Sequence, residues 1–599
     1  MCGIAAYTGK KNGNTVILNG LKKLEYRGYD SAGIAYLQNA SINILKSVGK
    51  VENLKELALK DKVNSFCIIG HTRWATHGKP SQENSHPHTG NKSEIALVHN
   101  GIIENYLELK QRLAAKGHKF KSETDSEVAA HLIEEYLKKT KNFEAAFTSA
   151  VKHLKGAYAI TAMYSKEPGV LMAAKKQSPL VLGIAEDEYF LASDVPAFLE
   201  YTRKVIFLED GDIIKISPTG YKITNAQGGN IKRKISFINW DSASAQKGGY
   251  KHFMLKEIFD QPQAVEDTLR TLPLNIEKSF SITPARAKKI KGFYIIACGT
   301  AYHAALAAKY WIESIAKLPA EVETASEFRY RDVNFQKDWV LAAISQSGET
   351  ADTLSALIKA KKAGVKVLSV CNVLGSTIAR ESDFTVYTHC GPEISVASTK
   401  AFTAQLTALY SLAINLAAAR GALSKKEAAS LYKELYRLPA LMTQALKTRE
   451  QIRKIAKKAY KKPSFIFLGR NTGYPLALEG ALKLKEISYL HAEGFAGGEI
   501  KHGPIALIDA ATPVITLMPA GKTYDKMLNS CREVEARGAD LIMITNECLS
   551  NAIVLPKTGE NLFPIIAAVP LQLFAYYIAD LRGREIDRPR NLAKSVTVE

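Results

Sequence analysis

The hydrophobic pattern divides the chain into two regions. In the first, up to about residue 240, short alternations of apolar and polar residues predict β-strands joined by turns. These predicted strands include residues 65–69, 94–98, 205–208 and 212–216. Helical periodicity interrupts them at residues 104–116 and 126–138. The first region is therefore expected to be a strand-rich domain with a few helices.

The second region alternates strand, loop and long helix, which is typical of a parallel sheet covered on both faces. A polar stretch within residues 221–250 predicts a linker before it. Two internal repeats follow: residues 293–299 resemble 463–469, and residues 364–372 resemble 538–546. We therefore expect two copies of one doubly wound α/β domain, with ligands at the carboxyl ends of the strands.

Composition narrows the functional classes. The 599 residues are 46% apolar and 23% charged, which suits two to four domains with full cores. Seven scattered cysteines without a Cys-x-x-Cys pair argue against a disulfide framework or a thiolate zinc site, and fit a reducing cytoplasm. The apolar run at residues 563–579 contains Pro564, Pro570 and Gln572, so we interpret it as core, not as a membrane span.

The net charge of +21 raises the question of nucleic acid as a partner. The basic residues form no stripe interleaved with aromatic residues, and their densest run, residues 447–462, predicts a helix with a solvated lysine face. We therefore expect no nucleic-acid partner. A positive field would also favour small anionic substrates.

Cys2 is the first candidate for chemistry, because removal of Met1 would place a thiol and a free α-amine on the same residue. An α-amino group titrates at about 7.7–8.0 and a thiol near about 8.5, so the amine can accept the thiol proton. The alternative is an ordinary second residue at a frayed terminus.

Two further motifs lie in the second region. A predicted strand ends in Ser345-Gln346-Ser347-Gly348-Glu349-Thr350 before a helix, which predicts either an anion cradle for a phosphate monoester or a plain N-cap turn. The predicted helix at residues 475–490 places Glu479, Lys483 and Glu486 on one face. That face is either a surface ion-pair ladder or a partly buried acid/base site.

Histidines give no metal site at the level of sequence. His86 and His88 lack a third ligand at suitable spacing, and no His-Glu-x-x-His pattern occurs. We therefore assign no metal.

Several motifs together carry a resemblance that extends over nearly the whole chain. They are CGI at residues 2–4, LEYRGYDSAG at 24–33, HTRWATHG at 71–78, HNGIIEN at 99–105, SETD at 122–125 and DRPRNLAKSVTVE at 587–599. The chain resembles the glutamine:fructose-6-phosphate aminotransferase family, also called the glucosamine-6-phosphate synthases. The resemblance implies an N-terminal-nucleophile amidotransferase domain (an αββα sandwich) followed by two doubly wound αβα sugar isomerase (SIS) domains.

The implied reaction converts fructose 6-phosphate and glutamine into glucosamine 6-phosphate and glutamate, the first step of amino sugar synthesis. At the glutamine site, Cys2 would be the nucleophile, while Asn100 and Gly101 would stabilise the oxyanion. The resemblance also implies Arg73 for the substrate carboxylate, Asp125 for its ammonium group, Thr76 and His77 in the pocket wall, Trp74 at an ammonia gate, and Arg27 in the loop supporting Cys2.

At the sugar site, the resemblance implies one set of residues that binds the phosphate group and another that lines the sugar. The phosphate would be bound by Ser345, Gln346, Ser347 and Thr350, and the sugar would be lined by Thr300, Val396, Ser398 and Ala593. Lys594 would form an imine with C2, Glu486 would move a proton from C1 to C2, and His502 would assist ring opening from the neighbouring subunit of a homodimer. This chemistry needs no metal or redox cofactor.

The resemblance also implies domain limits. They are 2–220 for the amidotransferase domain, 221–250 for the linker, 284–423 and 453–589 for the SIS domains, and 590–599 for an active-site tail. Ala301 stands where bacterial members carry Ser, so one sugar hydrogen bond is expected to be absent or replaced. The first domain lacks the long insertion of eukaryotic members, which argues against product feedback inhibition.

Two competing functions fit the sequence less well. A phosphoribosyl amine transferase would need a pyrophosphate loop with adjacent acidic residues, and we find none. A sugar-phosphate-sensing regulator would have no use for Cys2, Arg73, Asp125 or Lys594, and would normally carry a DNA-binding helix-turn-helix.

Overall fold

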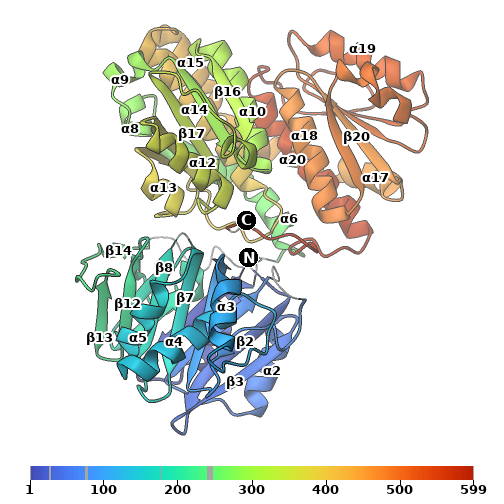
Figure 1. Ribbon diagram of the computed structural model, residues 1–599. Helices are drawn as coiled ribbons and strands as arrows, with labels where there is room; N and C mark the ends of the chain where they lie inside the picture. Colours follow the sequence, from blue (N-terminus) through green and yellow to red (C-terminus); the bar gives the residue numbers. More distant parts are fainter. Residues whose placement is uncertain are drawn as a thin grey trace. The chain divides into compact units, whose positions relative to one another are not determined.

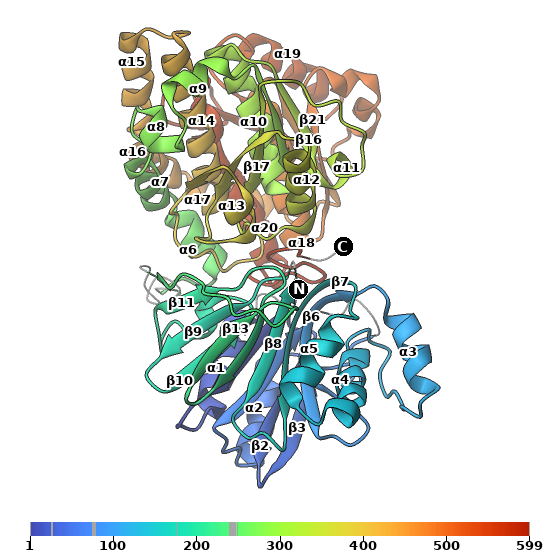
Figure 2. The ribbon, with the colours of Figure 1, turned by 60° about the vertical axis from the view of Figure 1, so that its left-hand side comes forward.

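A computed structural model describes residues 2–25, 28–74, 79–176, 178–238, 247 and 249–597. The chain forms two compact units, one of residues 1–244 with 593–599 and the other of residues 245–592. Figures 1 and 2 show the elements of each unit.

The first unit contains two antiparallel sheets. The eight-stranded sheet has the order β14 (Ser236–Phe237), β11 (Lys204–Phe207), β9 (Val181–Ala185), β10 (Glu188–Ala192), β1 (Gly3–Thr8), β4 (Cys67–Arg73), β2 (Ser31–Gln38), β3 (Ser41–Val48). The six-stranded sheet has the order β13 (Gly220–Thr224), β12 (Ile213–Ser217), β8 (Leu171–Lys176), β7 (Gly156–Tyr164), β6 (Ile95–Ile103), β5 (His88–Thr89). The strands predicted from alternation are thus confirmed, with ends shifted by a few residues.

Helices cover the outer faces of the two sheets. They are α1 (Asn14–Leu24) and α2 (Val51–Lys60) on the first sheet, and α3 (Tyr106–Ala114), α4 (Glu127–Thr140) and α5 (Phe143–Val151) on the second. A third apolar cluster fills the space between the sheets, with residues such as Ile4, Ile69 and Val98. The layers are therefore helix, sheet, sheet, helix, which is the expected αββα sandwich. Figure 2 shows α4 and α5 in front of the strands β7 and β8.

The stretch expected to be a linker contributes strands. β13 pairs with β12 through a two-residue turn at Pro218-Thr219, and β14 pairs with β11. The backbone pairing extends from Ser217 with Gly220 to Ile213 with Thr224, and Ile223 and Thr224 at its far end are buried. Residues 239–246 and 248 lie outside the described part of the chain.

The second unit holds two parallel sheets with the same strand order. The first is β16 (Ala320–Thr324), β15 (Gly292–Ala297), β17 (Trp339–Ser345), β18 (Lys366–Cys371), β19 (Phe384–Tyr387). The second is β21 (His491–Ala496), β20 (Ser464–Gly469), β22 (Val514–Met518), β23 (Leu541–Thr545), β24 (Ala552–Val554). The repeats seen in the sequence fall on equivalent strands, β15 with β20 and β18 with β23. The prediction of two copies of one doubly wound domain is confirmed.

Helices precede, cover and join these sheets. They are α6 (Phe253–Phe259), α7 (Gln261–Arg270), α8 (Ile276–Phe280), α9 (Pro284–Lys289), α10 (Thr300–Trp311), α11 (Ala325–Phe328), α12 (Ala351–Lys362), α13 (Thr377–Glu381), α14 (Lys400–Arg420), α15 (Lys425–Leu435), α16 (Leu438–Leu446), α17 (Arg449–Ala459), α18 (Gly473–Ser488), α19 (Tyr524–Glu535) and α20 (Phe563–Leu581). One apolar cluster includes residues of both sheets together with α10, α14, α18 and α20, so the two copies share a core.

Two of these helices are long and apolar enough to cross a membrane. The most apolar window of α14 is 94% buried inside the structure, and that of α20 is 83% buried. Burial against protein is what a core helix shows, and it agrees with the interpretation of residues 563–579 as core.

Candidate active sites

The first candidate site lies at the beginning of β1. The β1–β4 register pairs Gly3 with Thr72, which brings Cys2 beside the end of β4. The Cys2 Sγ accepts a hydrogen bond from the Trp74 N–H at 3.3 Å and lies 3.6 Å from the Trp74 carbonyl oxygen. The predicted nucleophile is therefore held at the end of a sheet and is not part of a frayed terminus.

The environment of the Cys2 thiol favours its neutral form. Burial raises the pKa of Cys2, although the Trp74 N–H and the Arg73 guanidinium act in the opposite direction. A thiol with a raised pKa needs a nearby base before it can act as a nucleophile.

Asn100 on β6 faces the same end of β1. Its Nδ2 donates to the Cys2 carbonyl oxygen at 3.0 Å, and its Oδ1 lies 3.0 Å from His71 Nε2. Burial lowers the pKa of His71 to about 3, so its imidazole is neutral at pH 7. Because a neutral His71 with its proton on Nε2 donates to Asn100 Oδ1, it turns the Asn100 amide nitrogen towards Cys2. The sequence motif contained His71, but this positioning role depends on a contact between β4 and β6.

Gly101 follows Asn100 and could not be replaced by a larger residue. Its φ is +128°, and a Cβ there would lie 2.0 Å from the carbonyl oxygen of Ala157 on β7. The close approach of β7 thus requires glycine at this position.

Arg73 and Asp125 supply charges of opposite sign near Cys2. Both side chains are buried, and both influence the pKa of the Cys2 thiol through space. Asp125 is fixed by the Ile103 N–H, which donates to its Oδ2 at 2.7 Å. Trp74 packs edge-on against Tyr29. Arg27, Thr76 and His77 lie outside the described residues, so their predicted roles stay predictions.

The second candidate site lies at the carboxyl end of β17. The Ser345 hydroxyl accepts the Gly348 N–H at 3.0 Å and lies 3.1 Å from the Thr350 hydroxyl. Ser347 Oγ accepts the Glu349 N–H at 3.2 Å, and the Gln346 carbonyl accepts the Asn372 N–H at 3.0 Å. The loop therefore brings three hydroxyls to the beginning of α12, where backbone N–H groups and the helix dipole favour an anion.

A buried charged network joins α18 to α10. Lys483 Nζ donates to the Thr300 hydroxyl at 3.0 Å and to the Glu486 carboxylate, and it lies 3.5 Å from Glu479. Glu479 also contacts His303 Nδ1 at 2.7 Å. Glu479 and Lys483 are fully buried, so the interpretation as a surface ladder is wrong, and the acid/base role of this face stays a prediction.

The network keeps Lys483 charged. Burial alone would lower its pKa, but Glu486 and Glu479 outweigh burial and raise it.

The remaining predicted sugar-site residues are more dispersed. The Val396 N–H donates to the Asp587 carbonyl at 3.0 Å, and the Ser398 hydroxyl donates to Glu393 at 3.1 Å, just before α14. His502 is exposed at the end of the 3-10 helix η4 (Glu499–His502). Ala593 and Lys594 belong to the first compact unit, so their place at the sugar site stays a prediction.

Comparison with known proteins agrees with this division. A family model described as a glutamine amidotransferase domain matches residues 71–200, and one described as a SIS domain matches residues 287–415 and 458–579. The C-terminal domain of glucosamine-fructose-6-phosphate aminotransferase from Francisella tularensis is 43% identical, covers 57% of this chain and 99% of its own, and has a TM-score of 0.55. The chain thus combines an amidotransferase domain with paired sugar isomerase domains.

Relatives of full length narrow the class further. Glutamine--fructose-6-phosphate aminotransferases [isomerizing] from Clostridium tetani, Aquifex aeolicus and Thermus thermophilus are each 48% identical over 610 residues, covering 100% of both chains. The chain belongs to the glutamine:fructose-6-phosphate aminotransferase (isomerizing) family of enzymes.

Proposed function

We propose that this chain converts glutamine and fructose 6-phosphate into glutamate and glucosamine 6-phosphate. The observation that carries the proposal is the placement of Cys2, with the Asn100 amide directed at it, on the same chain as the hydroxyl cradle after β17. An amidotransferase without a sugar site would not need the second arrangement, and a sugar-phosphate sensor would not need the first.

At the glutamine site, the α-amine of Cys2 takes the thiol proton after Met1 is removed, and the sulfur attacks the amide carbon. Asn100 Nδ2 and the Gly101 N–H then donate to the oxyanion. Ammonia leaves, and water hydrolyses the thioester to glutamate. Arg73 and Asp125 hold the two charged groups of glutamine, since a guanidinium fork fits a carboxylate. The chain passes the ammonia internally to the sugar site.

At the sugar site, Ser345, Gln346, Ser347 and Thr350 bind the phosphate group. Lys594 forms an imine with C2 of the open-chain ketose, and ammonia replaces the lysine nitrogen there. Glu486 takes a proton from C1 and returns it to C2, which converts the ketose into the amino-aldose. Thr300, Val396, Ser398 and Ala593 line the sugar.

We further propose a cytoplasmic homodimer in which His502 of one subunit assists ring opening in the other. Its exposure in this chain leaves the imidazole accessible to a second copy. The domain limits given above and the supporting role of Arg27 belong to the same proposal, as do the pocket roles of Thr76, His77 and Trp74.

The test supplies purified protein with both substrates and measures glutamate and amino sugar phosphate together. We expect the two products in equal amounts. Cys2→Ala should abolish glutamine use but retain synthesis from added ammonia, whereas Lys594→Ala should hydrolyse glutamine without making the amino sugar. Equal loss of both activities in Cys2→Ala would contradict two separable sites.

A further inference from the structure

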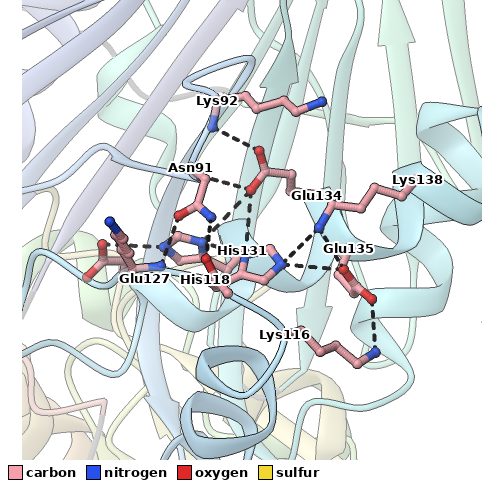
Figure 3. A network of polar contacts seen from close by, with 11 residues as sticks. Asn91, Lys92, Lys116, His118, Glu127, His131, Glu134, Glu135 and Lys138 are labelled. Atoms are coloured by element: carbon pink, nitrogen blue, oxygen red, sulfur yellow. Dashed lines mark hydrogen bonds and ion pairs between the residues drawn. The ribbon is translucent and has the colours of Figure 1, made fainter.

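A buried cluster of metal-ligating side chains lies outside both candidate sites. His118 lies in the segment between α3 and α4, and His131 and Glu134 lie one turn apart on α4 (Figure 3). All three are buried. Neither the glutamine reaction nor the sugar reaction uses them.

The three ligand atoms stand at the separations that a small metal ion requires. His118 Nδ1 lies 3.0 Å from His131 Nδ1 and 3.6 Å from Glu134 Oε2, and His131 Nδ1 lies 3.9 Å from the same oxygen. One point lies about 2.1 Å from all three atoms, which is the usual length of a Zn–N or Zn–O bond. The two imidazole rings are nearly perpendicular, at 87°.

A second layer of carboxylates sets the tautomers of the two histidines. His118 Nε2 lies 3.4 Å from Glu135 Oε2, and His131 Nε2 lies 3.5 Å from Glu127 Oε1. The contact with Glu135 favours the His118 proton on Nε2. The Glu127 carboxylate makes no hydrogen bond to His131 Nε2 but attracts the proton to that nitrogen, which leaves the Nδ1 lone pair of His131 for a metal as well. Two such lone pairs facing each other at 3.0 Å repel unless a cation lies between them.

Glu134 is held in place by the backbone before it reaches the histidines. The Asn91 N–H donates to its Oε2 at 2.8 Å and the Lys92 N–H donates to its Oε1 at 2.9 Å. A carboxylate has about four lone-pair positions, so Oε2 can still bind a metal ion. Figure 3 shows these contacts converging on the cluster from α4 and from the loop of Asn91.

The competing explanation for this cluster is a hydrogen-bond network without a metal ion, the proton network. Lys138 Nζ lies 3.3 Å from His118 Nε2 and 2.9 Å from Glu135. If Lys138 donated to that nitrogen, the His118 proton would move to Nδ1 and bridge to His131. The two explanations differ in whether metal binds and in whether Lys138 matters.

We propose that His118 Nδ1, His131 Nδ1 and Glu134 Oε2 bind one Zn²⁺ ion. Two imidazoles and one carboxylate are ligands that Zn²⁺ accepts readily, with a fourth position left for water. The ion fastens the segment between α3 and α4 onto α4. Because this segment carries Asp125, zinc stabilises the part of the first unit that would hold the ammonium group of glutamine.

The test uses tag-free, full-length protein that has been stripped with EDTA and then titrated with Zn²⁺ in a calorimeter. We expect one Zn²⁺ per chain, a higher melting temperature with zinc, and the visible bands of tetrahedral Co²⁺ when cobalt replaces it. His118→Gln and Glu134→Gln should lose this binding. His153→Gln, at an exposed histidine of the same unit, and Lys138→Met should retain it.

Circular dichroism in EDTA checks that the variants are folded. If the ligand variants do not fold, Glu135→Gln replaces them, with an expected loss of zinc affinity of about 10-fold or more. Wild-type protein that binds no zinc, or ligand and Glu135 variants that bind it as tightly as wild type, would overturn the proposal. Zinc binding that appears in Lys138→Met but not in wild-type protein would favour the proton network.

Discussion

Two buried polar clusters, one in each unit, differ in charge state. In the first, His71, His86 and His88 are buried, and burial lowers the pKa of His71 to about 3 and the pKa values of the other two well below 6.5. In the second, Lys483 is buried as an ammonium between Glu479 and Glu486. The first unit is therefore vulnerable to protonation, whereas the second is vulnerable to the loss of an ionic partner.

Lowering the pH is expected to produce the largest difference in stability between the two units. The folded pKa of His71 is depressed, so below the unfolded value of 6.5 the unfolded chain binds a proton that the folded chain does not. His71 then costs up to about 1.4 kcal/mol of stability per pH unit as the pH falls from 6.5 towards 3. His86 and His88 act in the same direction. The pKa of Lys483 is raised, so its contribution is complete below pH 10.5 and is lost only above it.

Hydrogen exchange followed by mass spectrometry resolves the two units. After correction for intrinsic rates, peptides of β4 and β6 should lose protection at pH 5 while peptides of α18 keep it. Equal loss in both would contradict the contrast between the units.

Lys483→Met tests the second unit. Removing the ammonium leaves the buried Glu479 and the partly exposed Glu486 without it, and breaking a buried pair in this way typically costs about 3–5 kcal/mol. We expect that loss in denaturant unfolding, together with loss of amino sugar synthesis. Lys485→Met, at an exposed position of the same helix, is the control and should be close to wild type. A stable, active Lys483→Met protein would show that the network is dispensable.

Asn100→Ala tests whether the chemistry of the first unit is separable. Loss of an oxyanion donor should lower glutamine hydrolysis by about 10²–10³-fold, equivalent to about 2.7–4 kcal/mol. His71→Gln should have a smaller effect in the same direction, because it only loosens the orientation of the amide. Synthesis from added ammonia should stay at the wild-type rate in both variants. If synthesis from added ammonia fell as far as glutamine hydrolysis, the two activities would not be separable.

Gly348→Ala is the mildest test and concerns the cradle after β17. Gly348 has φ of +63°, and a Cβ there would lie 2.0 Å from Ser376 Oγ. We expect a stability loss of about 1–3 kcal/mol and a higher KM for fructose 6-phosphate. Gly364→Ala is the matched control, since Gly364 has φ of +80° and nothing within 4 Å of the added carbon. If the two variants have the same KM for fructose 6-phosphate, the loop of residues 345–350 does not contribute to phosphate binding.

The sequence predicts the helices and strands better than it predicts the tertiary contacts that they make. The helix expected at residues 475–490 is α18, shifted by two residues, because its apolar periodicity is local information. The sequence does not show whether the polar face of α18 is buried, because the groups that cover Lys483, among them Thr300, come from α10 of the other copy.

The same reasoning applies to the sites of the first unit. Cys2 and Asn100 were found through motifs, but the role of His71 depends on the packing of β4 against β6. The polar residues of 221–250 predict a linker, yet hydrogen bonding to β12 and β11 makes two short strands, β13 and β14, in its first part. The spacing of His118 and His131 in the sequence predicts no metal site, because their convergence requires the turn that brings the chain back along α4.

The repeated strand order of the second unit has a consequence for mutational tolerance. β17 and β22 occupy equivalent places in their sheets, but β17 leads into Ser345–Thr350, whereas β22 leads into Pro519-Ala520-Gly521-Lys522. Under the proposed function, the loop at residues 345–350 binds the phosphate group, whereas no ligand is assigned to the loop at residues 519–522. Random substitutions should therefore survive selection for activity far more often at residues 519–522 than at residues 345–350.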